Sequence, residues 1–412
     1  MKKLFFCAGL VVFANLLHSQ TRVLFIGNSY TAVNNLPQLT ADCALSIGFA
    51  GFPMEVASST PGGTTFQMHT TNGSSQSLIA QGNWDFVVLQ EQSQLPSFPD
   101  SQVETECFPF AMQLNNQILA ADSCTETIFY MTWGRQNGDA GNCASWPPVC
   151  TYEGMDSLLN LRYRQMAIDN QAILSPVGAL WNYIRDTYPE INLYAADGSH
   201  PSLEGSYAAA CSMVSVIFRT DPTLINYNST LDPVIAEKIK LAAQEVVFNN
   251  LMEWHVGEYD PTVVVNTNTI GLSLQLDNQS APSWNFTWDF GDGTSSTEFS
   301  PVHVYNTPGS YLLSYSAIDA CGRSSQGSWE VQILSDDIEE LKKHYRILNH
   351  ENTFEIVFDF PVENLWVYDL NGRLVSKSNQ HSHSFFIAKE ESLRIIQFTM
   401  NGIKHEILLG VE

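Results

Sequence analysis

The chain has 412 residues, which is too long for one ordinary hydrophobic core and predicts two or three domains. It carries 19 basic and 43 acidic residues, so its formal net charge at neutral pH is −24. A surface of this charge repels nucleic acid and anionic membranes, and we exclude both as partners. The simplest meaning of the charge is solubility outside a cell.

The first twenty residues have the pattern of a signal peptide. Lys2 and Lys3 form a basic start, an apolar run follows from Leu4 to Leu17, and small and polar residues close the segment. The run is shorter than the roughly 20 residues that span a membrane. We therefore predict a protein without a transmembrane segment that is exported through the periplasm and is secreted or held at the cell surface.

Export permits disulfide bonds, and the cysteine count bears on them. An odd number of cysteines follows the predicted signal peptide, so at least one thiol is expected to stay unpaired. Cys143 and Cys150 bracket a short Trp-Pro-Pro loop and form the best predicted pair, and Cys107 with Cys124 is a second possibility. Metal binding is the alternative use of these residues, but the chain lacks Cys-x-x-Cys and His-x-x-x-His spacings, so we predict no metal and no organic cofactor.

From Arg22 to about Phe218, short β-branched runs alternate with longer amphipathic stretches. The predicted strands are residues 22–26, 54–59, 85–90, 127–132 and 172–177, and the predicted helices are 36–48, 103–120, 157–168 and 178–188. Such alternation predicts an α/β fold, a parallel sheet with helices on both faces. Ligands of such sheets bind beyond the carboxyl ends of the strands.

Beyond about Gly257 the composition shifts to Ser, Thr and Asn, and short alternating runs predict a β domain. Residues 288–317 contain WDFGDG, whose Gly-Asp-Gly makes a tight turn, followed by HVY and PGSY. Over residues 258–335 the chain closely resembles the PKD family of immunoglobulin-like β-sandwiches. Asp289 and Asp292 are candidates for calcium binding, although they lack EF-hand spacing, and we favour a role in the turn.

A charged linker, residues 336–344, leads to a final β segment, residues 345–412. Two Asn-Gly pairs, at 371–372 and 401–402, lie between alternating runs and predict β-hairpins. The stretch LWVYDLNGRLV resembles the C-terminal sorting domain of the type IX secretion system, which implies that this secretion machinery is a partner. The segment lacks the usual Asn-Pro start and the closing lysines of that family. Another small β-sandwich is the alternative.

A hydrolytic nucleophile needs a general base, and histidine is the base best suited to neutral pH. Only His69 and His200 lie clearly within the α/β region. His200 follows Asp197 by three positions in DGSH, so the carboxylate can accept the Nδ1 proton and leave Nε2 to deprotonate a hydroxyl. His69 has no carboxylate nearby in sequence, and we interpret it as a buried, non-catalytic residue.

Ser29 follows the first predicted strand through Gly27, which permits a sharp turn. Its hydroxyl is expected at the carboxyl edge of the sheet, where the loop with Asp197 and His200 also belongs. The alternatives are a serine that caps the next helix and one that lines a phosphate loop. The DGSH loop favours a nucleophile.

With both motifs present, residues 21–255 resemble the SGNH, or GDSL-type, hydrolase family. GNSY matches the family's first block, with Ser29 as nucleophile, and DGSHPS matches its fifth, with Asp197 and His200. The resemblance implies a flavodoxin-like three-layer α/β/α fold. Asn28 stands where the family usually has Asp, and it keeps an acceptor for the turn.

The same resemblance implies an oxyanion hole made of the nucleophile's backbone N–H, a glycine N–H and an asparagine side chain. The glycine is Gly62 or Gly63. The expected Gly-x-Asn-Asp turn is replaced by LQEQSQLP, in which Gln92 is the first candidate for the side-chain donor. Gln90 and Gln94 are rivals, and a purely structural loop is a further alternative.

Trp133 and Arg135 follow the fourth strand and are predicted to line the substrate pocket, the alternatives being a core position and a solvated charge. The first functional hypothesis is a secreted serine esterase acting on small-molecule or polysaccharide esters, for example acetyl groups on carbohydrate. The second is a non-catalytic adhesin or carbohydrate-binding protein on a hydrolase-like scaffold. A thioesterase, peptidase or lipase with the same triad is a third.

Overall fold

The computed structural model describes residues 20–48, 53–260, 262–280, 284–334, 344–369, 373–379, 382–388, 394–400 and 403–409. The chain divides into two compact units at Asp260 and Pro261. Most of the predicted signal peptide, the charged linker and both Asn-Gly turns lie outside the described residues.

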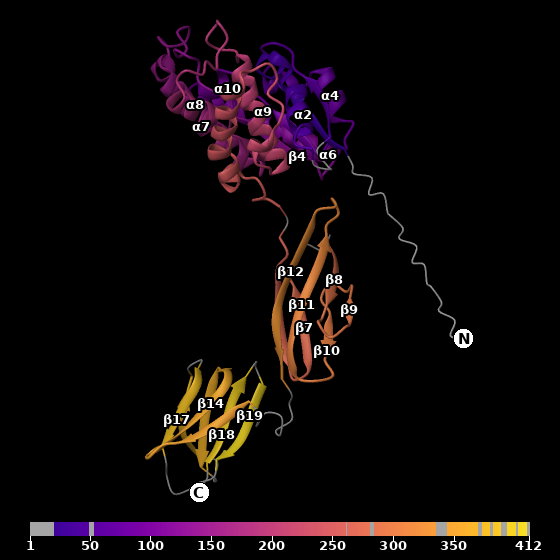
Figure 1. The fold of residues 1–412 in the computed structure, drawn as a ribbon, viewed down its shortest axis with the longest axis vertical. Helices are drawn as coiled ribbons and strands as arrows, with labels where there is room; N and C mark the ends of the chain where they lie inside the picture. The colour runs from indigo at the N-terminus through magenta and orange to yellow at the C-terminus, as the bar shows by residue number, and fades with distance from the viewer. Residues whose placement is uncertain are drawn as a thin grey trace, which may run out of the picture. The chain divides into compact units, whose positions relative to one another are not determined.

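The first unit is built on a parallel sheet, and Figure 1 shows the helices that surround it. Its five strands are β1 (Thr21–Ile26), β2 (Met54–Ser59), β3 (Phe86–Leu89), β4 (Glu126–Tyr130) and β5 (Ile173–Ser175). Their order is β2-β1-β3-β4-β5, the order of flavodoxin-like folds. All five strands lie where the sequence predicts them, and the prediction of a parallel α/β sheet is confirmed.

Ten α-helices surround this sheet in the described residues. They are α1 (Ser29–Ala32), α2 (Leu36–Leu45), α3 (Phe66–His69), α4 (Gly73–Ile79), α5 (Asp100–Glu106), α6 (Phe108–Ala121), α7 (Tyr152–Asp169), α8 (Val177–Thr187), α9 (Leu203–Phe218) and α10 (Pro233–Val246). One group consists of α2, α8, α9 and α10, and a second of α3, α4, α6 and α7, each packed among its own members. The chain turns from β1 to β2 in one direction and then to β3, β4 and β5 in the other, so right-handed crossovers place the two groups on opposite faces.

The single helix predicted over residues 103–120 is two helices, α5 and α6, which meet at Cys107. Pro109 explains the break, because a proline has no backbone N–H and its ring clashes with the carbonyl four residues earlier inside a helix. Proline is tolerated in the first turn, where it stands in α6.

The second unit contains only antiparallel strands in the described residues. Its first part has the sheets β10-β7-β6 and β12-β11-β8-β9, formed by β6 (Val265–Ile270), β7 (Ser273–Asn278), β8 (Asn285–Asp289), β9 (Ser295–Ser296), β10 (Val302–Val304), β11 (Gly309–Ile318) and β12 (Ser324–Ile333). Trp288 is fully buried here. Asp289 and Asp292 accept hydrogen bonds from the backbone amides of Gly291 and Thr294, as the turn interpretation expects.

The last part has its own core and the sheets β13-β14-β17 and β16-β15-β18-β19. The strands are β13 (Tyr345–Asn349), β14 (Thr353–Val362), β15 (Asn364–Asp369), β16 (Leu374–Ser378), β17 (Ser382–Ala388), β18 (Arg394–Met400) and β19 (Ile403–Leu409). β15 pairs antiparallel with β16, and β18 with β19, so both predicted strand pairs form on either side of the Asn-Gly positions.

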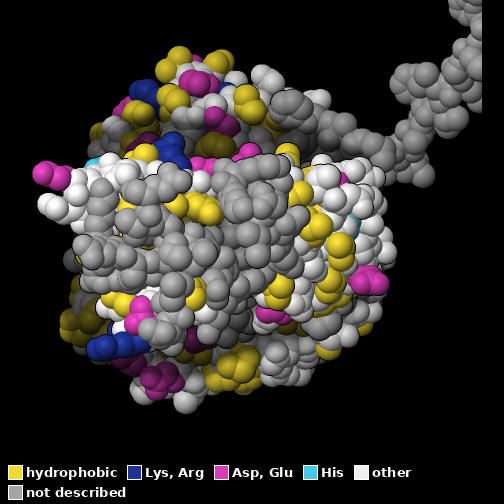
Figure 2. All heavy atoms as spheres, turned by 90° about the horizontal axis from the view of Figure 1, so that it is seen from below, with side chains coloured by type: hydrophobic (Ala, Val, Ile, Leu, Met, Phe, Trp, Pro, Cys, Tyr) yellow, Lys and Arg dark blue, Asp and Glu magenta, His cyan; other side chains and the backbone are white. Residues whose placement is uncertain are grey.

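On the face that Figure 2 shows, the coloured Lys and Arg side chains lie apart from one another. Among the described helices, none combines the length and the apolar composition needed to cross a bilayer.

The packing of α8 against the end of β4 makes a prediction for Gly178. The Gly178 amide donates to the Met131 carbonyl at 3.0 Å, and a Cβ there would overlap the Thr132 carbonyl. Gly178→Ala is expected to lower the free energy of unfolding by about 1–3 kcal/mol in urea denaturation. Gly73→Ala is the matched control, because a Cβ at this helical glycine meets open space. Equal effects of the two substitutions would contradict the packing argument.

Candidate active site

The turn after β1 carries Ser29 and leaves no room for a side chain at Gly27. A Cβ on Gly27 would lie 2.6 Å from the Thr31 hydroxyl oxygen and 2.7 Å from Oε1 of Gln90. Asn28 is the N-cap of α1, and its Oδ1 accepts a hydrogen bond from the Tyr30 amide at 3.1 Å. Since Asn28 fills the capping position, the helix-cap alternative for Ser29 does not hold, and the serine hydroxyl is left for other contacts.

The loop before α9 carries Asp197 and His200. Asp197 Oδ2 lies 2.5 Å from His200 Nδ1, and its Oδ1 accepts the backbone amides of Ser199 and His200 at 3.0 Å each. Partial burial raises the pKa of Asp197, but the hydrogen bonds from His200 and the two amides outweigh it and lower the pKa to about 2. Asp197 is therefore an anion at neutral pH, and it orients the imidazole.

The structure brings this loop to the exit of β1. His200 Nε2 lies 2.8 Å from Ser29 Oγ, although 171 positions separate the two residues in the sequence. The hydrogen bonds run in series from Ser29 through His200 to Asp197. A hydroxyl, a base and an acidic orienter in this order can activate the oxygen as a nucleophile.

Aromatic rings pack against the loop of residues 197–200, which carries the proposed base His200 and is called the base loop here. Tyr30 stacks on Trp133 with ring centroids 4.9 Å apart, and Trp133 stacks on Trp181 at 3.7 Å. The Tyr30 hydroxyl lies 2.6 Å from Ser199 Oγ, and Trp133 Nε1 donates to the Ser199 carbonyl at 3.1 Å. Trp133 is fully buried. It is therefore a core residue beneath the site and not a pocket-lining one, because its ring is used on both faces by the stack.

His69 is buried and contacts the turn of residues 27–29, which carries Ser29. Its Nε2 lies 2.9 Å from the Gly27 carbonyl and its Nδ1 2.7 Å from the Ser75 hydroxyl. Burial lowers the pKa of His69, so the neutral ring donates from Nε2 to the carbonyl. With both nitrogens engaged, His69 holds the turn and is not a rival base, in line with its non-catalytic interpretation.

The three candidate glutamines lie in different surroundings. Gln90 is fully buried, and its Oε1 accepts from the Asn28 amide at 3.0 Å and from the Thr31 hydroxyl at 2.9 Å. Gln92 is partly exposed, and its Oε1 accepts the amides of Gln94 and Leu95 at 2.8 and 3.0 Å. These two bonds orient the Gln92 amide, whose nitrogen donates to Gln94 Oε1 at 3.1 Å and keeps a second hydrogen.

The glycine pair lies on an exposed turn after β2. A Cβ on either Gly62 or Gly63 would meet nothing within 4 Å, and Gly63 has a φ of +69°. The next residue, Thr64, accepts a hydrogen bond at its carbonyl from Asn28 Nδ2 at 3.1 Å. This bond links the turn of Gly62 and Gly63 to the turn that carries Ser29.

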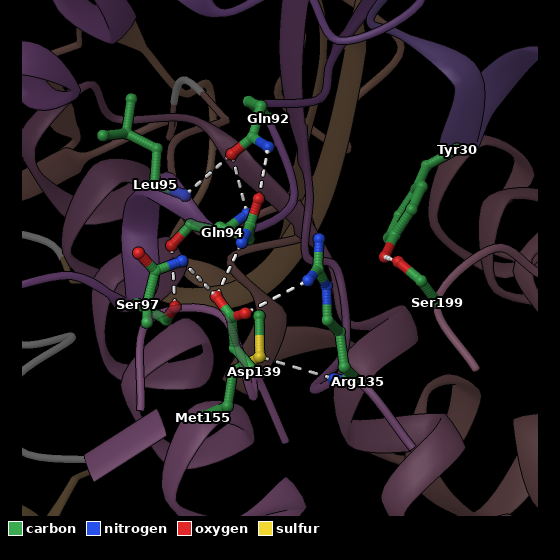
Figure 3. Close-up of polar contacts among 10 residues, drawn as sticks. Tyr30, Gln92, Gln94, Leu95, Ser97, Arg135, Asp139, Met155 and Ser199 are labelled. Carbon is green, nitrogen blue, oxygen red and sulfur yellow. Dashed lines mark hydrogen bonds and ion pairs between the residues drawn. The ribbon is translucent and has the colours of Figure 1, made fainter. Parts of the chain in front are cut away.

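Arg135 lies between two parts of the site. Figure 3 shows it with Asp139 and Gln94 on one side and with Tyr30 and Ser199 on the other. Its guanidinium contacts Asp139 at 3.2 Å, and Asp139 also accepts from Gln94 Nε2 at 2.6 Å. Burial raises the pKa of Asp139, but its hydrogen-bond donors and Arg135 keep that pKa below its usual value. Arg135 is partly exposed, so it can still face a ligand, unlike Trp133.

A disulfide closes the loop of residues 143–150, which follows Asp139 and is hydrogen-bonded to it. Cys143 and Cys150 are bonded as predicted, and the Asp139 amide donates to the Val149 carbonyl at 2.7 Å. Cys107 is a free, buried thiol, so the suggested pairing of Cys107 with Cys124 is wrong. Cys43 and Cys211 are also free, in line with the odd cysteine count. The described residues contain no group of three metal-binding side chains.

Glu91 was missed by the sequence reasoning. It is fully buried at the exit of β3, and its Oε1 accepts the Phe66 amide at 2.9 Å and the Gln92 amide at 2.5 Å. It thus links the loop after β2 to the loop that carries Gln92. Burial raises the pKa of Glu91 to about 8, so the carboxyl is mostly protonated at neutral pH. Its place directly after a buried strand was the one available signal.

Comparison with known proteins assigns the second unit in part. Residues 257–333 match the PKD domain family. Over 110 residues the chain is 30% identical to collagenase ColQ1 of Bacillus cereus, a match that covers 25% of this chain and 11% of the collagenase. The chain therefore spans about a tenth of the length of this relative.

The N-terminal half resembles solved structures. A protein of Slackia heliotrinireducens, described provisionally as an SGNH hydrolase, is 29% identical, with a TM-score of 0.40, over 48% of this chain and 98% of that one. A DUF4886 family protein from Bacteroides uniformis is 19% identical, with a TM-score of 0.47, over 55% of this chain and 94% of that one.

The raised pKa of Glu91 makes a prediction about stability. Between about pH 4.5 and about pH 8 the unfolded chain loses this proton while the folded chain keeps it, so folding becomes less favourable as the pH rises. Glu91→Gln keeps an acceptor for both amides and has no proton to lose. The stability of Glu91→Gln relative to wild type should therefore increase from pH 5 to pH 8 in urea denaturation.

Glu104→Gln, at an exposed position of α5, controls for the loss of one acidic residue. A difference between Glu91→Gln and wild type that stays constant or shrinks as the pH rises would contradict the protonated state of Glu91.

Proposed function

We propose that the protein is a serine hydrolase that cleaves carboxylic esters through Ser29, His200 and Asp197. One observation carries the proposal, namely the 2.8 Å contact between His200 Nε2 and Ser29 Oγ in series with the contact between His200 Nδ1 and Asp197. The position of Ser29 at the carboxyl end of β1 adds support, since ligands of parallel sheets bind at this edge. Acetyl esters of carbohydrates are the proposed substrates.

In the proposed reaction, Ser29 Oγ attacks the ester carbonyl while His200 Nε2 accepts its proton. The imidazolium is stabilised by Asp197 and then protonates the alcohol leaving group. Water, deprotonated by His200, attacks the acyl-enzyme and releases the acid, which restores Ser29. Each step uses the chain's own side chains.

The negative oxygen of the tetrahedral intermediate needs hydrogen-bond donors. The Ser29 amide opens α1, where no carbonyl of the helix can accept it, and it serves as the first donor. Gln92 supplies the second hydrogen of its oriented amide, and Gly62 or Gly63 supplies a backbone amide. Gln90 is excluded from this role because its side chain is fully buried beneath the turn.

The remaining segments are assigned to export and attachment. Residues 1–20 direct the chain across the inner membrane, and residues 345–412 act as a type IX sorting domain that is read by the secretion machinery. The PKD domain is a spacer or a binding module. The disulfide between Cys143 and Cys150 is compatible with an oxidising compartment outside the cytoplasm.

Ser29→Ala tests the nucleophile. The mature wild-type protein should hydrolyse a short-chain nitrophenyl ester and react covalently with a fluorophosphonate, and Ser29→Ala should lose labelling and lower kcat by ~10³-fold or more. Asp197→Asn should lower kcat by roughly 10²- to 10⁴-fold, because it no longer supports the imidazolium.

Thermal unfolding verifies that each variant is folded. If folded wild type neither hydrolyses the ester nor reacts at Ser29, the esterase proposal fails and the adhesin hypothesis takes its place.

Gln92→Ala tests the side-chain donor. Removing one oxyanion donor should lower kcat by about 10²- to 10³-fold with little change in KM, because the bond forms in the transition state. Gln81→Ala, at an exposed position between α4 and β3, is the control. A kcat of Gln92→Ala within twofold of the control would assign LQEQSQLP to a structural role.

A further inference from the structure

A cavity lies beside the loop of Asp197 and His200 and takes no part in the proposed reaction. It has a volume of about 590 Å³ and is lined by residues that include Gln136, Asn137, Tyr152, Arg185 and Tyr194. This volume is within the range of small-molecule sites. The residues come from the segment after β4, the start of α7, the end of α8 and the strand-like segment before the base loop.

The cavity wall is bonded to the loop that carries Asp197 and His200. The Gln136 amide donates to the Gly198 carbonyl at 2.8 Å, and Tyr194 forms a β-bridge with Pro201. A Cβ on Gly198 would lie 3.4 Å from the Gln136 side chain. A molecule in this cavity therefore lies against residues that contact the loop of His200, the proposed base.

Arg185 presents hydrogen-bond donors to the cavity. Its guanidinium carbon lies 3.8 Å from the centroid of the Tyr152 ring and 5.4 Å from that of Tyr194. In the part of the chain that the structure describes, no carboxylate forms an ion pair with Arg185. Stacking on Tyr152 fixes the plane of the guanidinium, which also donates to the Tyr194 hydroxyl and keeps further N–H donors for a ligand.

The charges of the lining favour a neutral ligand. Glu153 and Asp186 line the same cavity as Arg185, so the lining carries two carboxylates and one guanidinium. The exposed amides of Gln136 and Asn137 add donors and acceptors. Closely spaced donors and acceptors with little net charge match the hydroxyl groups of a sugar, whereas an anionic sugar would meet two like charges.

We propose that this cavity is a subsite for neutral saccharide units. It binds the sugar chain that carries the ester, and its role in catalysis rests on the proposed function of Ser29. Binding of the sugar is independent of that chemistry, so the two proposals can fail separately.

Binding is measured by calorimetric titration of full-length Ser29→Ala protein with xylohexaose, cellohexaose, mannohexaose and, as an anionic comparator, a galacturonic acid hexamer. At least one neutral sugar should bind, and Arg185→Gln should weaken its binding by about tenfold or more. Arg164→Gln is the matched control, because Arg164 also stacks on an aromatic ring, with its guanidinium carbon 4.3 Å from the centroid of Trp254. This control should bind as the parent does.

Three results would overturn the subsite: no binding of any neutral sugar at ~10 mM, tighter binding of the anionic hexamer, or equal binding by Arg185→Gln and Arg164→Gln.

In the background with Ser29 intact, Arg185→Gln should raise KM for an acetylated form of the bound sugar and leave nitrophenyl acetate hydrolysis within twofold. Loss of activity toward both substrates to the same extent would also contradict it. Failure of Ser29 to react with a fluorophosphonate bears on the proposed function alone.

Discussion

The site depends on the absence of a side chain at Gly27. The space that a Cβ would take is occupied by Oε1 of Gln90, which accepts the Asn28 amide and the Thr31 hydroxyl. From the other side, His69 holds the Gly27 carbonyl. These buried bonds fix the turn, and the turn aims Ser29 at the carboxyl edge of the sheet. A buried polar group without its partner costs about 1–3 kcal/mol, so each bond also resists movement of the turn.

The base loop is held by a different kind of contact. The stack of Tyr30, Trp133 and Trp181 packs beside it, and hydrogen bonds from Tyr30 and Trp133 hold Ser199. Tyr30 follows Ser29 directly in the chain. The turn that carries Ser29 therefore also carries the ring that packs against the loop of His200, which couples the two halves of the proposed triad by packing.

The sequence predicts the residues whose roles are local. Ser29 follows a buried strand through a glycine, and Asp197 precedes His200 by three positions, so short-range patterns identify them. Trp133 was assigned to the wrong surroundings, because a strand exit predicts the edge of the sheet but not the side to which a ring turns. Pro109 does predict the helix break that periodicity overlooks. Glu91 stands in a polar loop, and only the folded chain reveals that its carboxyl is buried.

The proposed oxyanion side of the site contains two buried carboxyl groups in opposite protonation states. Glu91 accepts hydrogen bonds from backbone amides and forms no ion pair within the described residues, and burial raises its pKa to about 8. Asp139 faces Arg135 and the amide of Gln94, which keep its pKa low. The neutral group links two loops without placing a negative charge near a developing oxyanion. The charged group, Asp139, is connected to Gln92 through Gln94. Arg135 balances the charge of Asp139. Neutral Glu91 and the Asp139 carboxylate paired with Arg135 together orient the Gln92 amide. They add little negative charge near the oxyanion of the proposed reaction.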